Sequence, residues 1–339
     1  MFSVISKKMA PQGGKSTKST YTTILKISIL ILFLSMIITV MITNNFIQFE
    51  QYYNIFKQKG LLILASYYSS NLKLTSSIQY IPKDRSKDPI YAKYLKDLNN
   101  YSKTGEDNYV EGDTRFAVLD GVGGYIQHGY DSSIISSRLA KYIKEYNNSS
   151  NDIKDCLATA YQKVLEDPEV EAGATTVTLS QIDPSTGEMD VLNLGDSWLG
   201  VLRDGEFVNE TLKQEYFFNA PYQLAKIPNT GKESRSISNK PEDADAYKFN
   251  LQKGDLVILS TDGMVDNWGR SKIADWWSEY LTDDCDLDKL NREFVRLVNK
   301  DSKDQTFYSE FVKEYNLLKN SRYTGGKEDD ITVLVVKVH

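Results

Sequence analysis

Apolar residues follow two alternating patterns along most of the chain from residue 78 onward. Short runs rich in valine, isoleucine and leucine alternate with segments in which apolar residues recur at helical spacing. The short runs predict strands, several of them buried on both faces, at 116–119, 175–182, 189–194, 198–202, 255–261 and 331–338. Between 190 and 208 the pattern further predicts successive antiparallel strands with tight turns at Gly195-Asp196 and Asp204-Gly205.

The helical periodicity is clearest over residues 131–146, where an apolar stripe follows the capping residue Asp131. Further helices are predicted over 152–166, 287–298 and 303–318, and their stripes are interpreted as core faces rather than cofactor sites. Helices layered over hairpin-containing sheets predict an α+β sandwich and argue against a purely parallel sheet.

The N-terminal part has a different pattern. Residues 24–43 are twenty mostly apolar positions with one charge, Lys26, and as a helix they would span a bilayer at about 1.5 Å per residue. We expect a transmembrane helix there; a cleaved signal and a buried core helix are the alternatives. The predicted organisation is a basic tail at 1–23, the membrane helix at 24–43, a linker and domain entry at 44–77, and a folded domain at 78–339.

Charge and composition exclude several functions. The 40 basic and 46 acidic residues give a net charge of −6, but residues 1–49 hold five lysines and no acid, so the remainder carries 35 basic and 46 acidic residues. Such an acidic body repels phosphate backbones, and we expect no nucleic-acid partner. Two cysteines and two histidines are too few for a zinc cluster. Neither cysteine is followed six positions later by the arginine that a cysteine-dependent phosphatase needs.

The acidic residues that attract attention stand at the ends of predicted strands. They are Glu106 and Asp107 in GEDNY, Asp120 in LDGVGG, Asp262 and Asp266 in TDGMVD, and Asp329 in GGKEDDITV. Carboxylates that converge at one sheet edge repel one another unless a cation lies between them. Because Mg²⁺ and Mn²⁺ prefer oxygen ligands, the pattern predicts a site for two such ions.

The motifs GEDNY, DGVGG, NLGDSW, TDGMVDN and GGKEDDITV, in this order, resemble those of the metal-dependent serine/threonine phosphatases of the protein phosphatase 2C family, in particular its fungal mitochondrial-type branch. The resemblance covers about three quarters of the chain. It implies a four-layer α-β-β-α sandwich with two central antiparallel sheets and a binuclear metal site at one edge.

The resemblance also implies roles for particular residues. Asp120 would bridge two Mg²⁺ or Mn²⁺ ions, Asp107 would orient metal-bound water, and residues 203–245 would form a mobile flap beside the site. The remaining implied ligands are Glu106 and the Gly121 carbonyl for one ion, Asp262 and Asp329 for the other, and Asp196 with Asp262 and Asp266 for a third, weaker ion.

The implied reaction is hydrolysis of phosphoserine and phosphothreonine in proteins by a metal-bridging water, without a phosphoenzyme. Two positions depart from the family pattern. Val122 stands where many members have a histidine that acts as general acid, and Ser102 stands where a phosphate-binding arginine is expected. The neighbouring Lys103 is the candidate replacement, although as a point charge it lacks the guanidinium fork.

These departures motivate one alternative, a catalytically weak scaffold that binds metal and recognises partners. A further alternative is a metal-dependent hydrolase of small phosphate esters. The resemblance favours the mitochondrial inner membrane, with the nuclear envelope or endoplasmic reticulum as alternatives because the tail contains no arginine. We expect phosphorylated proteins as substrates, contact with a membrane through residues 24–43, and a monomeric catalytic domain.

Overall fold

The computed structural model describes residues 71–94, 102–146, 152–228 and 237–339, all within a compact unit that comprises Ser69–His339. Within these ranges, no helix combines the length and apolar character needed to cross a membrane. Residues 24–43, where the sequence predicts a transmembrane helix, lie outside the described residues.

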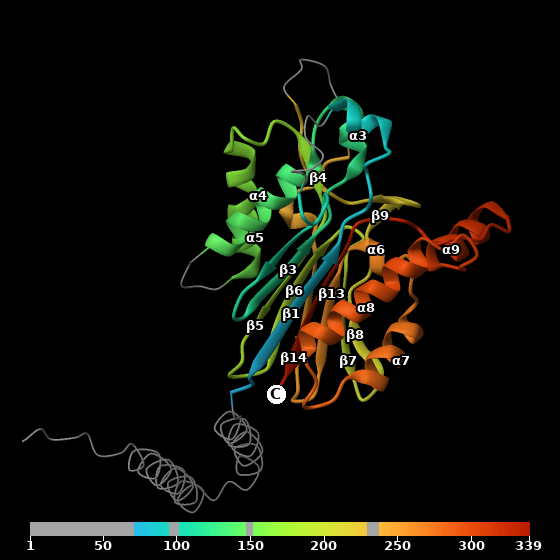
Figure 1. Ribbon diagram of the computed structural model, residues 1–339. Helices are drawn as coiled ribbons and strands as arrows, with labels where there is room; N and C mark the ends of the chain where they lie inside the picture. Colours follow the sequence, from blue (N-terminus) through green and yellow to red (C-terminus); the bar gives the residue numbers. More distant parts are fainter. Residues whose placement is uncertain (1–70, 95–101, 147–151, 229–236) are drawn as a thin grey trace, which may run out of the picture. The chain divides into compact units, whose positions relative to one another are not determined.

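Two antiparallel five-stranded sheets form the centre of this unit (Figure 1). The first has the order β1 (Leu74–Ile81), β14 (Ile331–Val338), β13 (Leu256–Ser260), β7 (Trp198–Arg203) and β8 (Glu206–Glu210). The second has the order β12 (Asp245–Asn250), β6 (Glu188–Leu194), β5 (Val177–Ile182), β3 (Arg115–Leu119) and β2 (Asn108–Glu111).

Helices cover the outer face of each sheet, with α4 and α5 on one side and α7 and α8 on the other (Figure 1). Their bounds are α4 (Ser132–Glu145), α5 (Ile153–Glu166), α7 (Arg270–Tyr280) and α8 (Leu287–Ser302). The shorter elements are α3 (Pro89–Tyr94), η2 (Gly123–His128), β4 (Gly173–Thr175), β9 (Glu215–Phe217), β10 (Ala220–Pro221), β11 (Leu224–Lys226), η3 (Pro241–Asp243), α6 (Asp262–Val265) and α9 (Glu310–Lys319).

The continuous apolar runs serve two cores at once because successive strand side chains point to opposite faces. In β3, Phe116 and Val118 enter the core between the sheets, whereas Ala117 and Leu119 pack against α4 and α5. The strand β14 alternates in the same way between the inter-sheet core and the core beneath α7 and α8. The predicted α-β-β-α sandwich is therefore confirmed.

Most predicted elements are present within a few residues of their expected bounds, but two expectations were wrong. The turn at Asp204-Gly205 does close a hairpin, with both residues at positive φ, whereas Gly195-Asp196 carries the chain from β6 in one sheet to β7 in the other. The predicted helix at 303–318 begins only at α9, because the Asp304 carboxylate accepts the backbone N–H of Thr306 in a turn and Ser309 caps the new helix.

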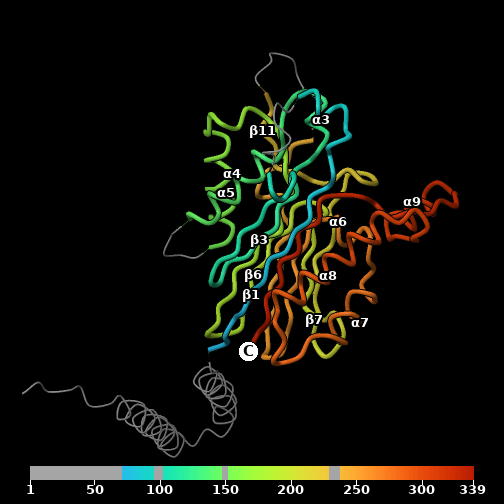
Figure 2. The backbone as a smooth tube through the Cα atoms, in the orientation of Figure 1, coloured from blue at the N-terminus to red at the C-terminus, as the bar shows by residue number. Residues whose placement is uncertain are grey.

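The strand that begins the catalytic fold and the strand that ends it lie side by side (Figure 2). Leu74 pairs with Val338 and Ile81 pairs with Ile331 along the full length of β1 and β14. The segments that follow Ile81 and precede Ile331 therefore meet at one edge of the sandwich.

Candidate active site

The predicted acidic residues lie at this common edge because each stands where a strand enters or leaves it. Asp120 directly follows β3, Asp262 follows β13 after one residue, and Asp329 comes two residues before β14. Asp196 lies in the link that crosses between the sheets. Antiparallel neighbours expose alternate ends at a given edge, so residues far apart in the sequence converge here.

These side chains line a cavity of about 510 Å³. Its lining includes Glu106, Asp120, Gly121, Asp196, Asp262 and Asp329. Asn219 and Pro221, from the segment expected to be a flap, also line it. Asp107 is fully buried beneath, where its carboxylate accepts a hydrogen bond from Thr261 Oγ1 at 2.8 Å.

The loop around Asp120 leaves no room for a side chain at Gly121. A Cβ on Gly121 would lie 2.5 Å from the carbonyl oxygen of Glu106 and 2.9 Å from that of Ser132. Hydrogen bonds from the backbone N–H of Val122 to the Ala174 carbonyl, and from that of Thr176 to the Asp120 carbonyl, hold the loop against β4 and β5. The glycine therefore allows the DGVGG segment to pack directly on the segment that carries Glu106.

Several carboxylates here are buried without compensation. Oxygen atoms of Glu106, Asp107 and Asp196 are buried and have no hydrogen-bond partner among the described residues. Burial, followed by the charges of neighbouring carboxylates, raises the pKa of Asp107, Asp120 and Asp196 well above the ordinary range.

A divalent cation fits this arrangement. Asp120, Asp196 and Asp262 each offer one oxygen, and the three oxygens lie within 4.8 Å of one another. Unpaired buried carboxylate oxygens are costly in the absence of a positive charge, and they are the ligands that Mg²⁺ and Mn²⁺ prefer. The donor set is thus suited to a hard divalent ion.

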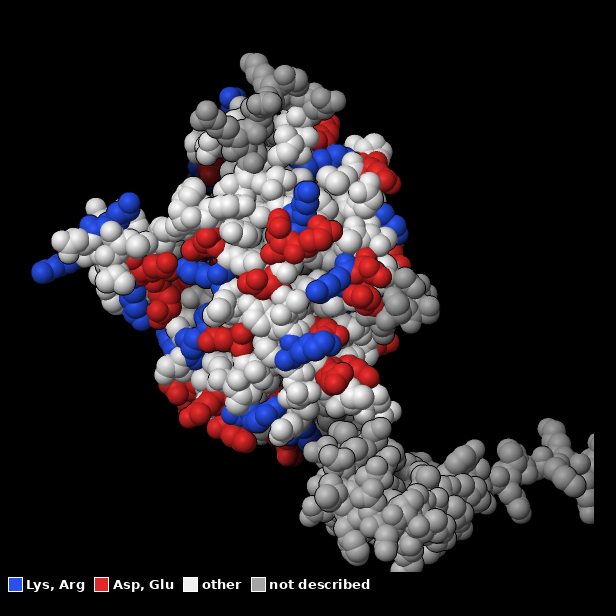
Figure 3. All heavy atoms as spheres, turned by 180° about the vertical axis from the view of Figure 1, so that it is seen from behind, with Lys and Arg blue, Asp and Glu red and all other residues white. Residues whose placement is uncertain are grey.

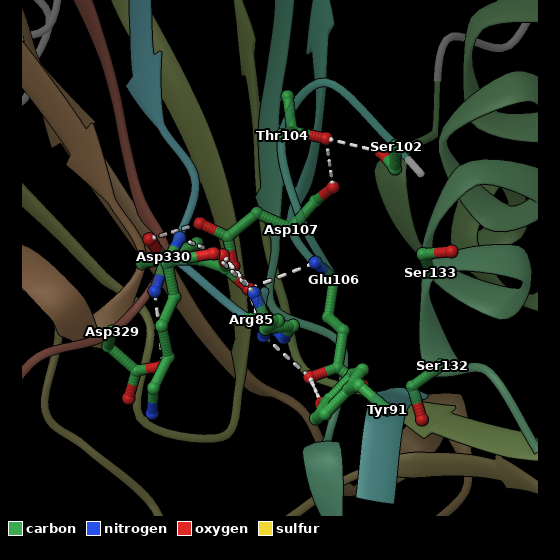
Figure 4. Close-up of polar contacts among 12 residues, drawn as sticks. Arg85, Tyr91, Ser102, Thr104, Glu106, Asp107, Ser132, Ser133, Asp329 and Asp330 are labelled. Atoms are coloured by element: carbon green, nitrogen blue, oxygen red, sulfur yellow. Dashed lines mark hydrogen bonds and ion pairs between the residues drawn. The ribbon is translucent and has the colours of Figure 1, made fainter. Parts of the chain in front are cut away.

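The cavity is lined in part by a group of contacting side chains, Arg85, Tyr91, Glu106 and Asp330, which we call the Arg85 cluster (Figure 4). The guanidinium of Arg85 donates to both oxygens of Asp330 at 2.7 and 2.6 Å and to Glu106 Oε2 at 2.8 Å. The Tyr91 hydroxyl donates to the same Glu106 oxygen at 2.6 Å. All four residues are buried.

Burial raises the pKa of Glu106 to about 7, although Arg85 and the Tyr91 hydroxyl oppose the shift. For Arg85 the balance is reversed, since Asp330 and Glu106 raise its pKa further despite burial. The guanidinium therefore stays charged and holds two carboxylates that are 224 residues apart in sequence.

A second group, which we call the Lys327 cluster, comprises Asp262, Lys327 and Asp329, which line the cavity, and Asp266, which is not part of its lining. The ammonium of Lys327 contacts Asp262, lies 2.6 Å from Asp266 Oδ2 and lies 3.3 Å from Asp329 Oδ2. These carboxylates raise the pKa of Lys327 well above its ordinary value despite its burial. Two protein cations thus line the cavity, and each of them is paired with carboxylates.

Comparison with known proteins agrees with this architecture. The family model of stage II sporulation protein E (SpoIIE) matches residues 110–339. Protein phosphatase 2C homolog 7, mitochondrial, of Saccharomyces cerevisiae is 42% identical over 284 residues, which cover 78% of this chain and 82% of the relative. The 5-azacytidine resistance protein azr1 of Schizosaccharomyces pombe is 34% identical over 254 residues, which cover 70% and 84%.

Among solved structures, that of the photosystem II phosphatase PBCP matches with a TM-score of 0.64 at 27% identity, over 78% of this chain and 99% of that chain. The chain belongs to the protein phosphatase 2C family. It is therefore a metal-dependent protein phosphatase that hydrolyses phosphoserine and phosphothreonine, with Mg²⁺ or Mn²⁺ as its cofactor.

Most residues that the sequence singled out in this phosphatase come together at the cavity, but Lys103 does not. Lys103 is exposed and is not among the cavity-lining residues, whereas Arg85, 21 residues before Glu106, lines the cavity and contacts Glu106 directly. Val122 also lines the cavity, at the position where many members of the family have histidine.

Sequence reasoning missed Arg85, Tyr91 and Lys327. Lys327 is part of the motif GGKEDDITV, in which the sequence analysis assigns a role only to an acidic residue. The signal for Arg85 was weaker: it follows the end of β1 by four residues, at the edge where the acids gather. An arginine or lysine next to a strand end in an otherwise acidic edge is the pattern that would have found both cations.

Proposed function

We propose that this cavity is the catalytic site of the phosphatase and that Asp120 is its central metal ligand. Glu106 and Gly121 would bind one ion, and Asp262 and Asp329 would bind the other. The observation that carries the proposal is the group of buried oxygens from Glu106, Asp107 and Asp196 that have no hydrogen-bond partner among the described residues. Such oxygens are compensated when divalent ions lie between them.

Bound there, Mg²⁺ or Mn²⁺ would neutralise phosphate charge and activate water for in-line attack on phosphorus. The protein's own contribution is orientation. The hydrogen bond from Thr261 fixes one oxygen of Asp107 and thereby the orientation of the carboxylate. The other oxygen can then hold a water molecule or accept its proton.

Arg85 is the positive charge that we assign to the substrate phosphate. Its guanidinium lines the cavity, and its pairing with Asp330 prevents it from swinging away. The same contacts make Arg85 a positioning residue for Glu106. In this assignment Arg85 replaces both the arginine expected at Ser102 and the candidate Lys103, which does not line the cavity.

We further propose that the substrates are phosphorylated proteins reached by a monomeric catalytic domain. The walls of the cavity include Asn219 and Pro221, so the flap segment would contact the chain around a phosphorylated residue. On the face shown in Figure 3, acidic and basic side chains are interspersed without a continuous basic surface. This distribution and the acidic body support the absence of a nucleic-acid partner.

For location, we propose a mitochondrial phosphatase anchored in the inner membrane through residues 24–43, with 1–23 as a basic tail, 44–77 as linker and 78–339 as catalytic domain. The relative from Saccharomyces cerevisiae is named as mitochondrial, and the apolar length of residues 24–43 suits a bilayer. Protease protection of a C-terminally tagged chain in isolated mitochondria tests this. Extraction by carbonate would contradict the anchor.

Asp120→Asn tests the catalytic assignment. We expect phosphopeptide hydrolysis with Mn²⁺ to fall by roughly a thousandfold or more, because a neutral amide cannot hold two cations together. The matched control is Asp113→Asn, an exposed aspartate in the turn between β2 and β3, which should retain wild-type turnover. Activity retained by Asp120→Asn, or turnover of phosphate metabolites in preference to phosphopeptides, would contradict the proposal.

A further inference from the structure

Lys327 lies among the acidic residues where a divalent ion would be expected. The sequence led us to expect a third, weaker ion on Asp196, Asp262 and Asp266. In the structure the Lys327 ammonium contacts Asp262 and lies 2.6 Å from Asp266 Oδ2. Two of the three carboxylates expected to hold that ion therefore already have a positive partner.

The position of Lys327 is built into the backbone. Its N–H donates to Asn267 Oδ1 at 2.9 Å, and its carbonyl accepts from Asn267 Nδ2 at 2.8 Å. The same Nδ2 donates to the Gly263 carbonyl at 2.8 Å, so Asn267 ties the lysine to the helix that carries Asp262 and Asp266.

The side chain of Lys327 is also enclosed. It is 15% exposed, and its ammonium lies 5.2 Å from the centre of the Phe311 ring. A lysine that served only solubility would extend into water and keep its rotamer freedom. Holding this side chain in one place has an entropic cost, which the three carboxylates offset.

A divalent ion and this ammonium cannot share Asp266 Oδ2. Two positive charges a few ångströms apart repel each other by several kcal/mol at the effective dielectric of a protein surface. Asp120, Asp196 and Asp262 still form a group of oxygens within 4.8 Å. Since a carboxylate has two oxygens, Asp262 can face the ammonium with one and a metal ion with the other, whereas Asp266 is not part of this group of oxygens and has the ammonium as its partner.

We propose that Lys327 is a built-in monovalent cation that takes the place of the third divalent ion, so that this phosphatase holds two metal ions. The inference rests on the proposed metal site. It adds the number of metal ions that the site holds and names the residue that limits this number. The ammonium compensates Asp266 permanently, and the acidic edge stays assembled without a third ion from solution.

The test is the number of Mn²⁺ ions bound by the full-length chain in detergent, measured by electron paramagnetic resonance of free Mn²⁺ during titration. We expect two ions for wild type and for Lys327→Arg, which keeps the charge. Lys327→Met should bind a third ion at least tenfold more tightly than wild type binds any third ion. Lys327→Met combined with Asp266→Asn should lose that gain.

Thermal unfolding supplies a readout independent of activity. In chelator, Lys327→Met should unfold at a lower temperature than wild type, because Asp262, Asp266 and Asp329 lose their counter-charge, and Mn²⁺ should restore the difference. If Lys327→Met does not fold, the ion count of Lys327→Gln decides, since that side chain is polar and uncharged.

The outcomes separate the two proposals. A wild-type chain that binds no Mn²⁺ at saturation overturns the metal site itself. Wild type that binds two ions, with Lys327→Met unchanged in count, affinity and unfolding temperature, overturns only the role of Lys327. Wild type that binds three ions, with the third lost in Asp266→Asn, also overturns it, because the ammonium would then have to leave Asp266.

Discussion

The two clusters at the catalytic cavity use different cations for the same problem of gathered carboxylates. In the Arg85 cluster a planar guanidinium makes fixed bonds to Asp330 and Glu106, and the side chains are 3–6% exposed. In the Lys327 cluster a single ammonium contacts three carboxylates that are 11–28% exposed. A rigid fork in a dry environment locks its partners, whereas a point charge contacts single carboxylate oxygens and leaves the other oxygens of those carboxylates able to face a metal ion.

This difference explains why both basic residue types occur at one site. Asp330 accepts from Arg85 with both oxygens and also from the backbone N–H groups of Lys83 and Glu106. It is therefore saturated and suited to a structural role. In contrast, Asp329 Oδ2 lies 3.3 Å from the Lys327 ammonium, which is a looser contact. The Asp329 carboxylate can therefore turn toward a metal ion.

The largest expected effect is on stability, and it tests directly whether Arg85 locks the carboxylates of its cluster. Arg85→Met leaves Glu106 and Asp330 buried without a counter-charge, and we expect the free energy of unfolding to fall by about 3–5 kcal/mol. Urea unfolding in chelator measures it. Arg296→Met is the matched control, because the ion pair of Arg296 with Glu293 is exposed and its loss should change little. Equal effects of the two substitutions would show that Arg85 is not a structural lock.

The dependence of stability on pH tests how strongly burial affects Glu106 in the Arg85 cluster. Since burial raises the pKa of Glu106 to about 7 from 4.5, the folded metal-free protein binds this proton more tightly than the unfolded chain does. Protonation therefore stabilises the fold at low pH, and this stabilisation is lost as the pH rises from 4.5 through 7. Asp107, Asp120 and Asp196 shift in the same direction.

We accordingly expect the unfolding temperature of metal-free protein to decrease across this pH window, and the decrease to be shallower in Glu106→Gln. Mn²⁺ should reverse the trend, because metal ions bind deprotonated carboxylates. Differential scanning calorimetry of dialysed protein measures all three. A metal-free unfolding temperature that rises with pH would contradict the assignment.

The smallest effect concerns which cation meets the substrate phosphate. Arg85→Lys keeps the charge but loses the fork, so we expect kcat/KM for a phosphopeptide to fall about tenfold, equivalent to about 1.4 kcal/mol. Lys103→Met should stay within about twofold of wild type, because Lys103 does not line the cavity. The reverse result would indicate that Lys103, and not Arg85, contacts the substrate phosphate.

The acids of the site could be predicted from sequence because each adjoins an apolar run long enough to be a strand. Asp120 follows 116–119 in one sheet and Asp329 precedes 331–338 in the other, and both strand ends lie at the cavity edge of the sandwich. The fold class followed from the same runs. The link at Gly195-Asp196 was misjudged, since a turn between strands does not reveal whether the strands share a sheet.

The cations could not be predicted in the same way. Arg85 and Asp330 are 245 residues apart, and their contact depends on the register of β1 against β14, which places Ile81 opposite Ile331. No local spacing contains that information. For Lys327 the residue was visible, but its direction depends on how Asn267 holds the GGK segment against α6.

The pairing of β1 with β14 has a practical consequence for handling this phosphatase. Eight extended residues cover about 27 Å, so the start of β1 and the C-terminal His339 lie at the far end of the sandwich from the cavity. A tether attached ahead of β1 would therefore leave the cavity accessible to large protein substrates. Immobilisation on a sensor chip or fusion of a fluorophore at the C-terminus should, for the same reason, leave turnover intact.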